Sequence, residues 1–230
     1  MSKKERGAVL IEESTTLPPG RKFFFGIGIN AYEHLSTLRN AVKDLDDVAA
    51  VLLDKYDFDQ EHLVLLKNEQ ATRKNIINKL YGFTNASALG SDDSLLIYFS
   101  GHGLLDENKD GYWVPVEAER GDIDSFVPNE TVQKCIKNMK CRHVLLISDS
   151  CFSGSLLSRG RSVPNDNLLA DVLESKKSRW VITSGGRDET VQDGSGENSP
   201  FAEAILSELR YNHRPKLVSD ELALRVRGIV

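Results

Sequence analysis

The chain has 230 residues, with 40% apolar and 27% charged residues, which is typical of a globular protein with one large domain or two small ones. The net charge of −5 disfavours a nucleic-acid-binding protein, which would need a clustered basic face. No apolar run reaches the length of a membrane span, and the N-terminus is too polar for a signal peptide. Three cysteines cannot form a disulfide framework, so we expect a reduced, cytoplasmic, single-domain protein.

Apolar periodicity predicts alternating strands and helices after a flexible polar tail at residues 1–22. The expected strands are residues 22–30, 62–67, 94–100, 143–148 and 180–184. The expected helices are residues 40–54, 72–83, 131–139, 167–175, 200–210 and 219–227. Strands that are apolar on both faces and separated by helices indicate an α/β fold, with a mostly parallel sheet covered by helices on both faces.

Two of the expected strands end in clusters that can carry chemistry. His102 lies between two glycines just after one strand, and Cys151 follows another strand closely. In open parallel sheets the functional residues gather beyond the carboxyl ends of the strands, so neighbouring strands would place His102 and Cys151 side by side. A cysteine nucleophile needs such a base to form its thiolate, and it needs backbone N–H groups near the developing oxyanion. Gly103 and Gly154 would let the backbone approach a substrate closely.

The segments Ile97-Tyr-Phe-Ser-Gly-His-Gly103 and Asp149-Ser-Cys-Phe-Ser-Gly154 resemble the paired signatures of the caspase-like cysteine peptidases (clan CD, C14 family). The metacaspase and bacterial caspase-like branch is the most similar. The interval of 49 residues between His102 and Cys151 agrees with the spacing of about 50 in caspases. The resemblance implies a caspase-like fold with a central, mostly parallel, six-stranded-type sheet in a domain at residues 23–230. Its large-subunit-like part would be residues 23–154.

The same resemblance implies the roles of the catalytic residues. Cys151 would be the nucleophile, and His102 would be the general base and acid. The backbone N–H groups of Gly103 and Cys151 would form the oxyanion hole. No third residue that orients the histidine is identifiable from the sequence. A structural role for Cys151 as a buried thiol is the alternative, and the pairing with His102 argues against it.

In metacaspases an acidic pocket accepts Arg or Lys before the scissile bond, and the matching positions here are Asp149, Asp44 and Ser100. Paired carboxylates suit a buried guanidinium, so we expect cleavage of protein or peptide substrates after Arg or Lys. Two alternatives stay open for the acids. Asp149 could bond local N–H groups at its strand end, and Asp44 could serve the first turn of a helix.

A cleavable loop between a large and a small portion is common in this family, and it falls at residues 155–179 here. It holds five basic residues that a basic-specific enzyme would accept: Arg159, Arg161, Lys176, Lys177 and Arg179. We therefore expect a zymogen that is cut by itself or by a partner. The small portion, residues 180–230, is short for the family, so we expect an activating partner or a regulatory domain beyond residue 230. The resemblance also implies a stress or defence pathway.

Two other segments match ligand-binding patterns. Asp106, Asn108 and Asp110 belong to a calcium-loop pattern, but the flanking segments are not helical, so an acidic turn between two strands is the other interpretation. Gly26 and Gly28 match part of a dinucleotide-binding fingerprint, but they lie inside an apolar run that predicts a buried strand. The peptidase chemistry requires no cofactor. Many metacaspases depend on calcium, yet the segment after the predicted nucleophile here lacks the acid that would bind it.

Two other functions remain open at this point. One is a catalytically idle caspase-like module that binds partners. The other is a protease specific for Asp, which would need a basic or Gln-lined pocket, and Asp149 contradicts that. No binding to nucleic acid or membrane is expected.

Overall fold

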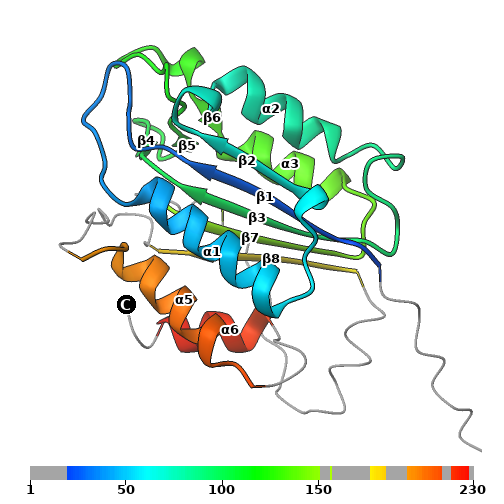
Figure 1. Ribbon diagram of the computed structural model, residues 1–230. Helices are drawn as coiled ribbons and strands as arrows, with labels where there is room; N and C mark the ends of the chain where they lie inside the picture. The colour runs from blue at the N-terminus through cyan, green and yellow to red at the C-terminus, as the bar shows by residue number, and fades with distance from the viewer. Residues whose placement is uncertain (1–19, 151–155, 157–176, 185–195, 214–218, 228–230) are drawn as a thin grey trace, which may run out of the picture.

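The computed structural model describes residues 20–150, 156, 177–184, 196–213 and 219–227 (Figure 1). Its centre is a five-stranded sheet in the order β2-β1-β3-β7-β8, and every pairing in it is parallel. The strands are β1 (Lys22–Gly28), β2 (Leu63–Lys67), β3 (Ser94–Ser100), β7 (His143–Asp149) and β8 (Ser178–Thr183). The expected α/β class with a mostly parallel sheet is therefore confirmed, and the described residues supply five strands to it.

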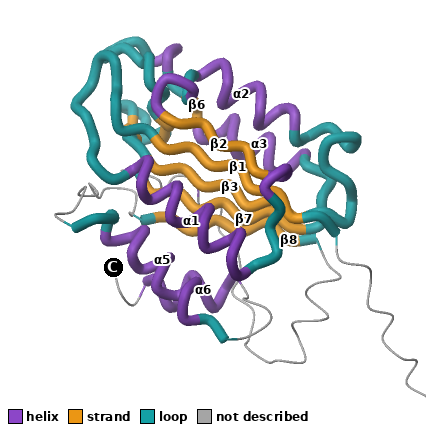
Figure 2. The backbone as a smooth tube through the Cα atoms, viewed as in Figure 1, coloured by secondary structure: helices purple, strands orange, loops and turns teal. Residues whose placement is uncertain are grey.

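Helices cover both faces of the sheet (Figures 1 and 2). One layer contains α1 (Ala41–Lys55), α5 (Pro200–Tyr211) and α6 (Ser219–Arg227), and the other contains α2 (Arg73–Gly82) and α3 (Asn129–Asn138). Side chains alternate between the faces, so Phe24 packs in the core beneath α1 and α5 while Phe25 packs in the core beneath α2 and α3. No helix in the described part of the chain is long and apolar enough to cross a membrane.

A small antiparallel sheet begins directly after His102, and the periodicity did not predict it. Its order is β4-β5-β6, formed by β4 (Gly103–Leu105), β5 (Gly111–Trp113) and β6 (Val127–Pro128). Strands of two or three residues are too short to show an alternating pattern. Trp113 of this sheet stacks on Phe99 of β3, with ring centroids 4.4 Å apart. Three short 3-10 turns complete the described elements: Gln60–His62, Asn68–Gln70 and Ile123–Ser125.

The element boundaries differ from the predicted ones by a few residues. Thr72 is the N-cap of α2, as expected, because its side chain accepts the N–H of Asn75 at 3.2 Å. The predicted tail is too long at its end: Lys22 begins β1, and the Arg21 guanidinium pairs with Asp93 at 2.7 Å. The predicted helix at 167–175 lies outside the described residues.

Arg179 was predicted in a processing loop, and the structure corrects this. It lies in β8, which starts two residues earlier than predicted. Its guanidinium donates to five main-chain carbonyls at 2.7 to 3.1 Å, those of Ile136, Met139, Cys141, Arg142 and Ser178. Two of these carbonyls, those of Ile136 and Met139, lie in the last turn of α3 and at its C-cap, where a cation is favourable. Arg179 therefore fastens β8 to α3, and the loop has to end before it.

Gly26 and Gly28 let α1 approach β1 closely. A Cβ at Gly26 would lie 2.2 Å from Leu45 Cδ1, and one at Gly28 would lie 2.8 Å from the carbonyl oxygen of Ala41. These glycines therefore serve helix–strand packing in the first core strand. This agrees with the prediction that the segment is a buried strand rather than a dinucleotide-binding loop.

We predict that Gly28→Ala lowers the free energy of unfolding by about 1–3 kcal/mol, because the new methyl group collides with backbone that cannot move alone. Gly82→Ala is the matched control: nothing lies within 4 Å of its Cβ position in α2, so we expect no loss and a gain of up to ~1 kcal/mol. Urea denaturation of both variants measures this. Equal effects would contradict the close approach.

Candidate active site

The expected side-by-side arrangement of the two strand ends is present up to the last described residues. β3 and β7 are neighbours in register, and Ser100 lies directly opposite Asp149 at their carboxyl ends. His102 follows β3 by two residues. Cys151 follows β7 by two residues and lies outside the described part of the chain, as do Arg159, Arg161 and Lys176.

The imidazole of His102 is held by the loop that follows β1. Its Nε2 lies 2.8 Å from the carbonyl oxygen of Ser36 and 3.3 Å from the Ser36 hydroxyl. The carbonyl can only accept a hydrogen bond, so it favours the tautomer with the proton on Nε2. In that tautomer Nδ1 is the basic nitrogen. The Ser36 carbonyl is thus an orienting group that the sequence could not reveal, because it is a backbone atom 66 residues away from the histidine.

Tyr32 of the same loop lies under His102. Its hydroxyl accepts the backbone N–H of His102 at 2.7 Å, and the two ring centroids are 4.7 Å apart. Gly101 makes room for this hydroxyl, since a Cβ there would lie 2.6 Å from it. The backbone around His102 is also tied to the neighbouring strand, because the Gly101 N–H donates to the Asp149 carbonyl at 3.2 Å.

The three predicted pocket residues come together on the α1 side of this sheet edge. Ser100 and Asp149 are buried partners across two strands, and Asp44 in the first turn of α1 is fully buried. Ser199 bridges the two acids: its backbone N–H donates to Asp44 Oδ1 at 3.2 Å, and its hydroxyl donates to Asp149 Oδ2. Each carboxylate thus bonds to a residue far away in the chain, and Asp44 also lies in the first turn of α1, as its alternative interpretation expected.

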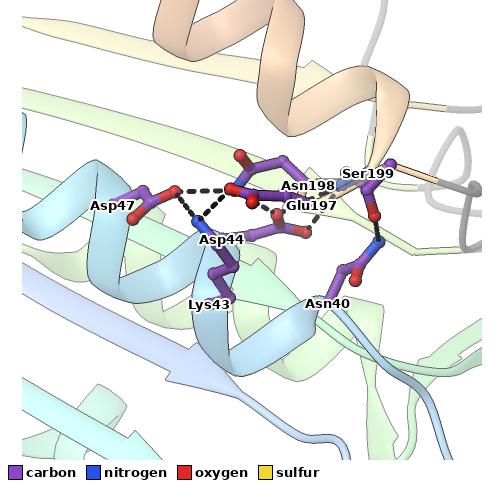
Figure 3. A network of polar contacts seen from close by, with 8 residues as sticks. Asn40, Lys43, Asp44, Asp47, Glu197, Asn198 and Ser199 are labelled. Atoms are coloured by element: carbon purple, nitrogen blue, oxygen red, sulfur yellow. Dashed lines mark hydrogen bonds and ion pairs between the residues drawn. The ribbon is translucent and has the colours of Figure 1, made fainter.

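Asn198 extends this bridge to the exposed side of α1 (Figure 3). Its side-chain amide donates to Asp44 Oδ1 and to Asp47 Oδ2, both at 2.9 Å. Lys43 Nζ also binds Asp47, at 2.6 Å. The segment that leads into α5 is therefore fastened to the start of α1. Sequence reasoning missed Asn198 and Ser199. The Ser-Pro pair could have identified Ser199 as a helix N-cap, but not its contact with the acids.

Burial dominates the ionisation of the Asp44 carboxyl and raises its pKa to about 6. The negative charge of Asp149 acts in the same direction, while the hydrogen bonds from Asn198 and Ser199 oppose the rise. For Asp47, partial burial also disfavours ionisation, but the hydrogen bonds from Lys43 and Asn198 outweigh it and lower the pKa. The negative charge of Asp44 and Asp149 is thus only partly compensated, because their donors Asn198 and Ser199 are neutral. The pair therefore still attracts a cation.

The segment that matches the calcium-loop pattern is closed by its own hydrogen bonds. The Asp106 carboxylate caps its own turn: Oδ1 accepts the N–H groups of Asn108 and Asp110 at 2.9 and 2.8 Å, and Oδ2 accepts the Tyr112 hydroxyl at 3.2 Å. Within the described residues, no three His, Cys, Asp or Glu side chains are grouped so that they could hold a metal ion. This segment is an acidic turn between β4 and β5.

A parallel α/β sheet with a histidine fixed at its carboxyl edge, next to a pair of buried carboxylates, defines a caspase-like architecture. The chain belongs to the caspase domain family, Peptidase_C14, which matches residues 25–230. Members of this family are cysteine-type endopeptidases. The resemblance seen in the two sequence motifs is therefore confirmed.

The chain is similar to several metacaspases. It is 28% identical over 179 residues to Metacaspase-4 of Arabidopsis thaliana, which covers 67% of this chain and 40% of that protein. It is 24% identical over 212 residues to Metacaspase-1 of Saccharomyces cerevisiae, covering 78% and 48%. The chain thus spans less than half the length of these relatives. The structure of Caspase-1 from Spodoptera frugiperda matches with a TM-score of 0.64 at 16% identity, over 92% of this chain and 77% of the other, and shows the shared fold.

We predict that Asp44→Asn flattens the pH dependence of stability. A carboxyl whose pKa is higher in the folded protein stabilises the fold below its unfolded pKa, and this contribution is lost as the pH rises through the folded value. Between pH 4 and pH 6.5 the free energy of unfolding of the parent should fall, relative to the variant, by up to about 3 kcal/mol.

Urea denaturation at the two pH values, in a Cys151→Ala background that lacks the predicted nucleophile, measures this difference. Asp46→Asn is the matched control, because it removes the same charge from a half-exposed position on the same helix. Parallel profiles for the parent and Asp44→Asn would contradict the effect of burial.

Proposed function

We propose that this protein is a cysteine endopeptidase that cleaves protein substrates after Arg or Lys through a Cys151–His102 dyad. The observation that supports it best is the convergence of Asp44, Asp149 and Ser100 at the sheet edge that carries His102. Two carboxylates buried together at a strand end are unfavourable unless they are compensated. The pair suits the recognition of a cationic side chain.

In the proposed reaction the Cys151 thiol gives its proton to His102 Nδ1, and the thiolate attacks the scissile carbonyl carbon. The resulting oxyanion accepts hydrogen bonds from the N–H groups of Gly103 and Cys151. His102 then protonates the leaving amine as the C–N bond breaks, which leaves an acyl-enzyme. Water, deprotonated by His102, attacks this thioester, and its collapse releases the carboxylate product and the protonated thiol.

The pocket chemistry sets the substrate class. Two carboxylates beside one hydroxyl attract a guanidinium or an ammonium group and repel an acidic side chain. Since the pKa of Asp44 is about 6, the pocket carries both charges only above that pH, and substrate affinity should weaken as the pH falls through this range. An Asp-specific protease would require the opposite charge here.

We predict that fluorogenic peptides ending in Arg or Lys are hydrolysed, whereas those ending in Asp or Gln are not. Cys151→Ala should abolish the hydrolysis, and Asp149→Asn should lower kcat/KM for Arg by roughly 100-fold, because a buried charged hydrogen bond to the substrate is lost. Asp46→Asn is the charge-matched control, with an effect below threefold, because Asp46 lies on α1 but pairs with Lys67 outside this network.

The same assay with calcium and with a chelator tests the metal requirement, and we expect equal rates. Hydrolysis after Asp would refute the pocket assignment. Silence toward every peptide, in protein that has been cut in its loop, would favour the idle interaction module.

We further propose that the protein is a zymogen of a stress or defence pathway, processed in the loop before β8. Lys177 is exposed directly before that strand, which makes it an accessible candidate. We predict cleavage after one or more of Arg159, Arg161, Lys176 and Lys177, and none after Arg179, whose guanidinium is bonded to five carbonyls. Mass spectrometry of active protein beside Cys151→Ala identifies the cut. An intact loop in fully active protein would refute processing.

A further inference from the structure

One loop after β1 holds His102 from two directions. Tyr32, buried beneath the imidazole, accepts the His102 backbone N–H at 2.7 Å, and its ring lies 4.7 Å from the imidazole centroid. Four residues further on, the Ser36 carbonyl lies 2.8 Å from Nε2. The backbone N–H of His102 and the Nε2 atom of its ring are thus both fixed by the same segment of chain.

This loop is itself anchored at several points. The side-chain oxygen of Asn68 accepts the N–H groups of Asn30 and Ala31 at 2.9 and 3.1 Å. The loop also closes on itself, because the Leu38 N–H donates to the Asn30 carbonyl at 2.9 Å. The Glu33 N–H donates to the Val116 carbonyl at 3.0 Å. Tyr32 is therefore presented by backbone that is tied to two other parts of the fold, so its hydroxyl has a defined position.

The fit between Tyr32 and the histidine segment is tight. A Cβ at Gly101 would lie 2.6 Å from the Tyr32 hydroxyl and 3.2 Å from Cζ of Phe99. Only glycine at this position lets the hydroxyl reach the next N–H group along the chain. The hydrogen bond fixes the peptide that precedes His102, and the next N–H along the chain is that of Gly103, the first residue of β4.

We propose that Tyr32 is a positioning residue for the catalytic dyad. It sets the orientation of the His102 imidazole, and through the same backbone it sets the direction of the Gly103 N–H toward the oxyanion. This inference rests on the dyad of the proposed function but not on the specificity for Arg or Lys. Misplacement of a catalytic group by about 1 Å can cost up to ~100-fold in rate, so loss of one orienting hydrogen bond should be measurable in kcat.

The test uses Tyr32→Phe, which keeps the ring and removes the hydroxyl. The first readout is the pH profile of Cys151 alkylation by iodoacetamide, followed by peptide mapping, since it requires no substrate. The two other cysteines, Cys135 and Cys141, are buried and serve as internal references. We expect the midpoint for Cys151 to move up toward ~8.5, the value of an unassisted thiol. In the peptidase assay we expect kcat to fall roughly tenfold with little change in KM.

Tyr56→Phe is the matched control, because it also removes a tyrosine hydroxyl that is hydrogen-bonded to the main chain: the Tyr56 hydroxyl donates to the Leu209 carbonyl at 3.0 Å, at the far end of α1. It should change the melting temperature about as much as Tyr32→Phe and leave the alkylation midpoint unchanged. If Tyr32→Phe gives the same midpoint and the same kcat as this control, the proposal is wrong.

Gly101→Ala provides a second test, which separates the loss of this contact from a general loss of stability. Gly101→Ala should be strongly impaired, because its methyl group collides with the Tyr32 hydroxyl, and Tyr32→Phe should relieve that collision in the double variant. Additive losses would refute the contact. If His102→Ala does not change the alkylation of Cys151, the dyad and this proposal both fail. Normal alkylation with no cleavage after Arg or Lys would instead refute only the specificity.

Discussion

The parallel pairing of β3 with β7 is the constraint on which the whole site depends. Because the two strands run in the same direction and in register, their carboxyl ends stop at the same level, with Ser100 opposite Asp149. His102 and Cys151 each follow within two residues of those positions. A slip of one residue in this pairing would turn the pocket residues to the other face of the sheet, toward α2 and α3. The packing of Phe24 and Tyr98 on one side, and of Phe25 and Ile97 on the other, excludes such a slip.

The buried carboxylates of Asp44 and Asp149 depend on hydrogen-bond donors from another part of the chain. Burying a carboxylate is unfavourable unless it is hydrogen-bonded, and Asp44 is fully buried beside a second acid. The donors that offset this cost, Asn198 and Ser199, come from the segment before α5. That segment also begins the helix that packs against α1, so the pocket and the core on this face are assembled together.

The histidine is held from the other side of the sheet edge, by the loop after β1. The pocket and the base are thus supported by different parts of the chain: α1 and the start of α5 hold the acids, while Tyr32 and Ser36 hold His102. The two sets are also linked, because the loop that carries Tyr32 and Ser36 leads directly into α1, and Asn30 Oδ1 in that loop accepts the Val42 N–H at 3.0 Å.

The sequence by itself determined the fold class and the strands that carry the candidate site, and it supplied the candidates for the pocket and the base. Apolar runs predicted β3 and β7, the two glycine-flanked motifs singled out His102 and Cys151, and the resemblance to caspase-like peptidases implied Asp149 and Asp44 as pocket residues. The short strands β4 to β6, the role of Arg179 in β8, and the contacts of Tyr32, Ser36, Asn198 and Ser199 were decided only by the tertiary structure. Each of these depends on backbone carbonyls, on N–H groups or on partners more than thirty residues away, and such pairings leave no periodic trace in the chain.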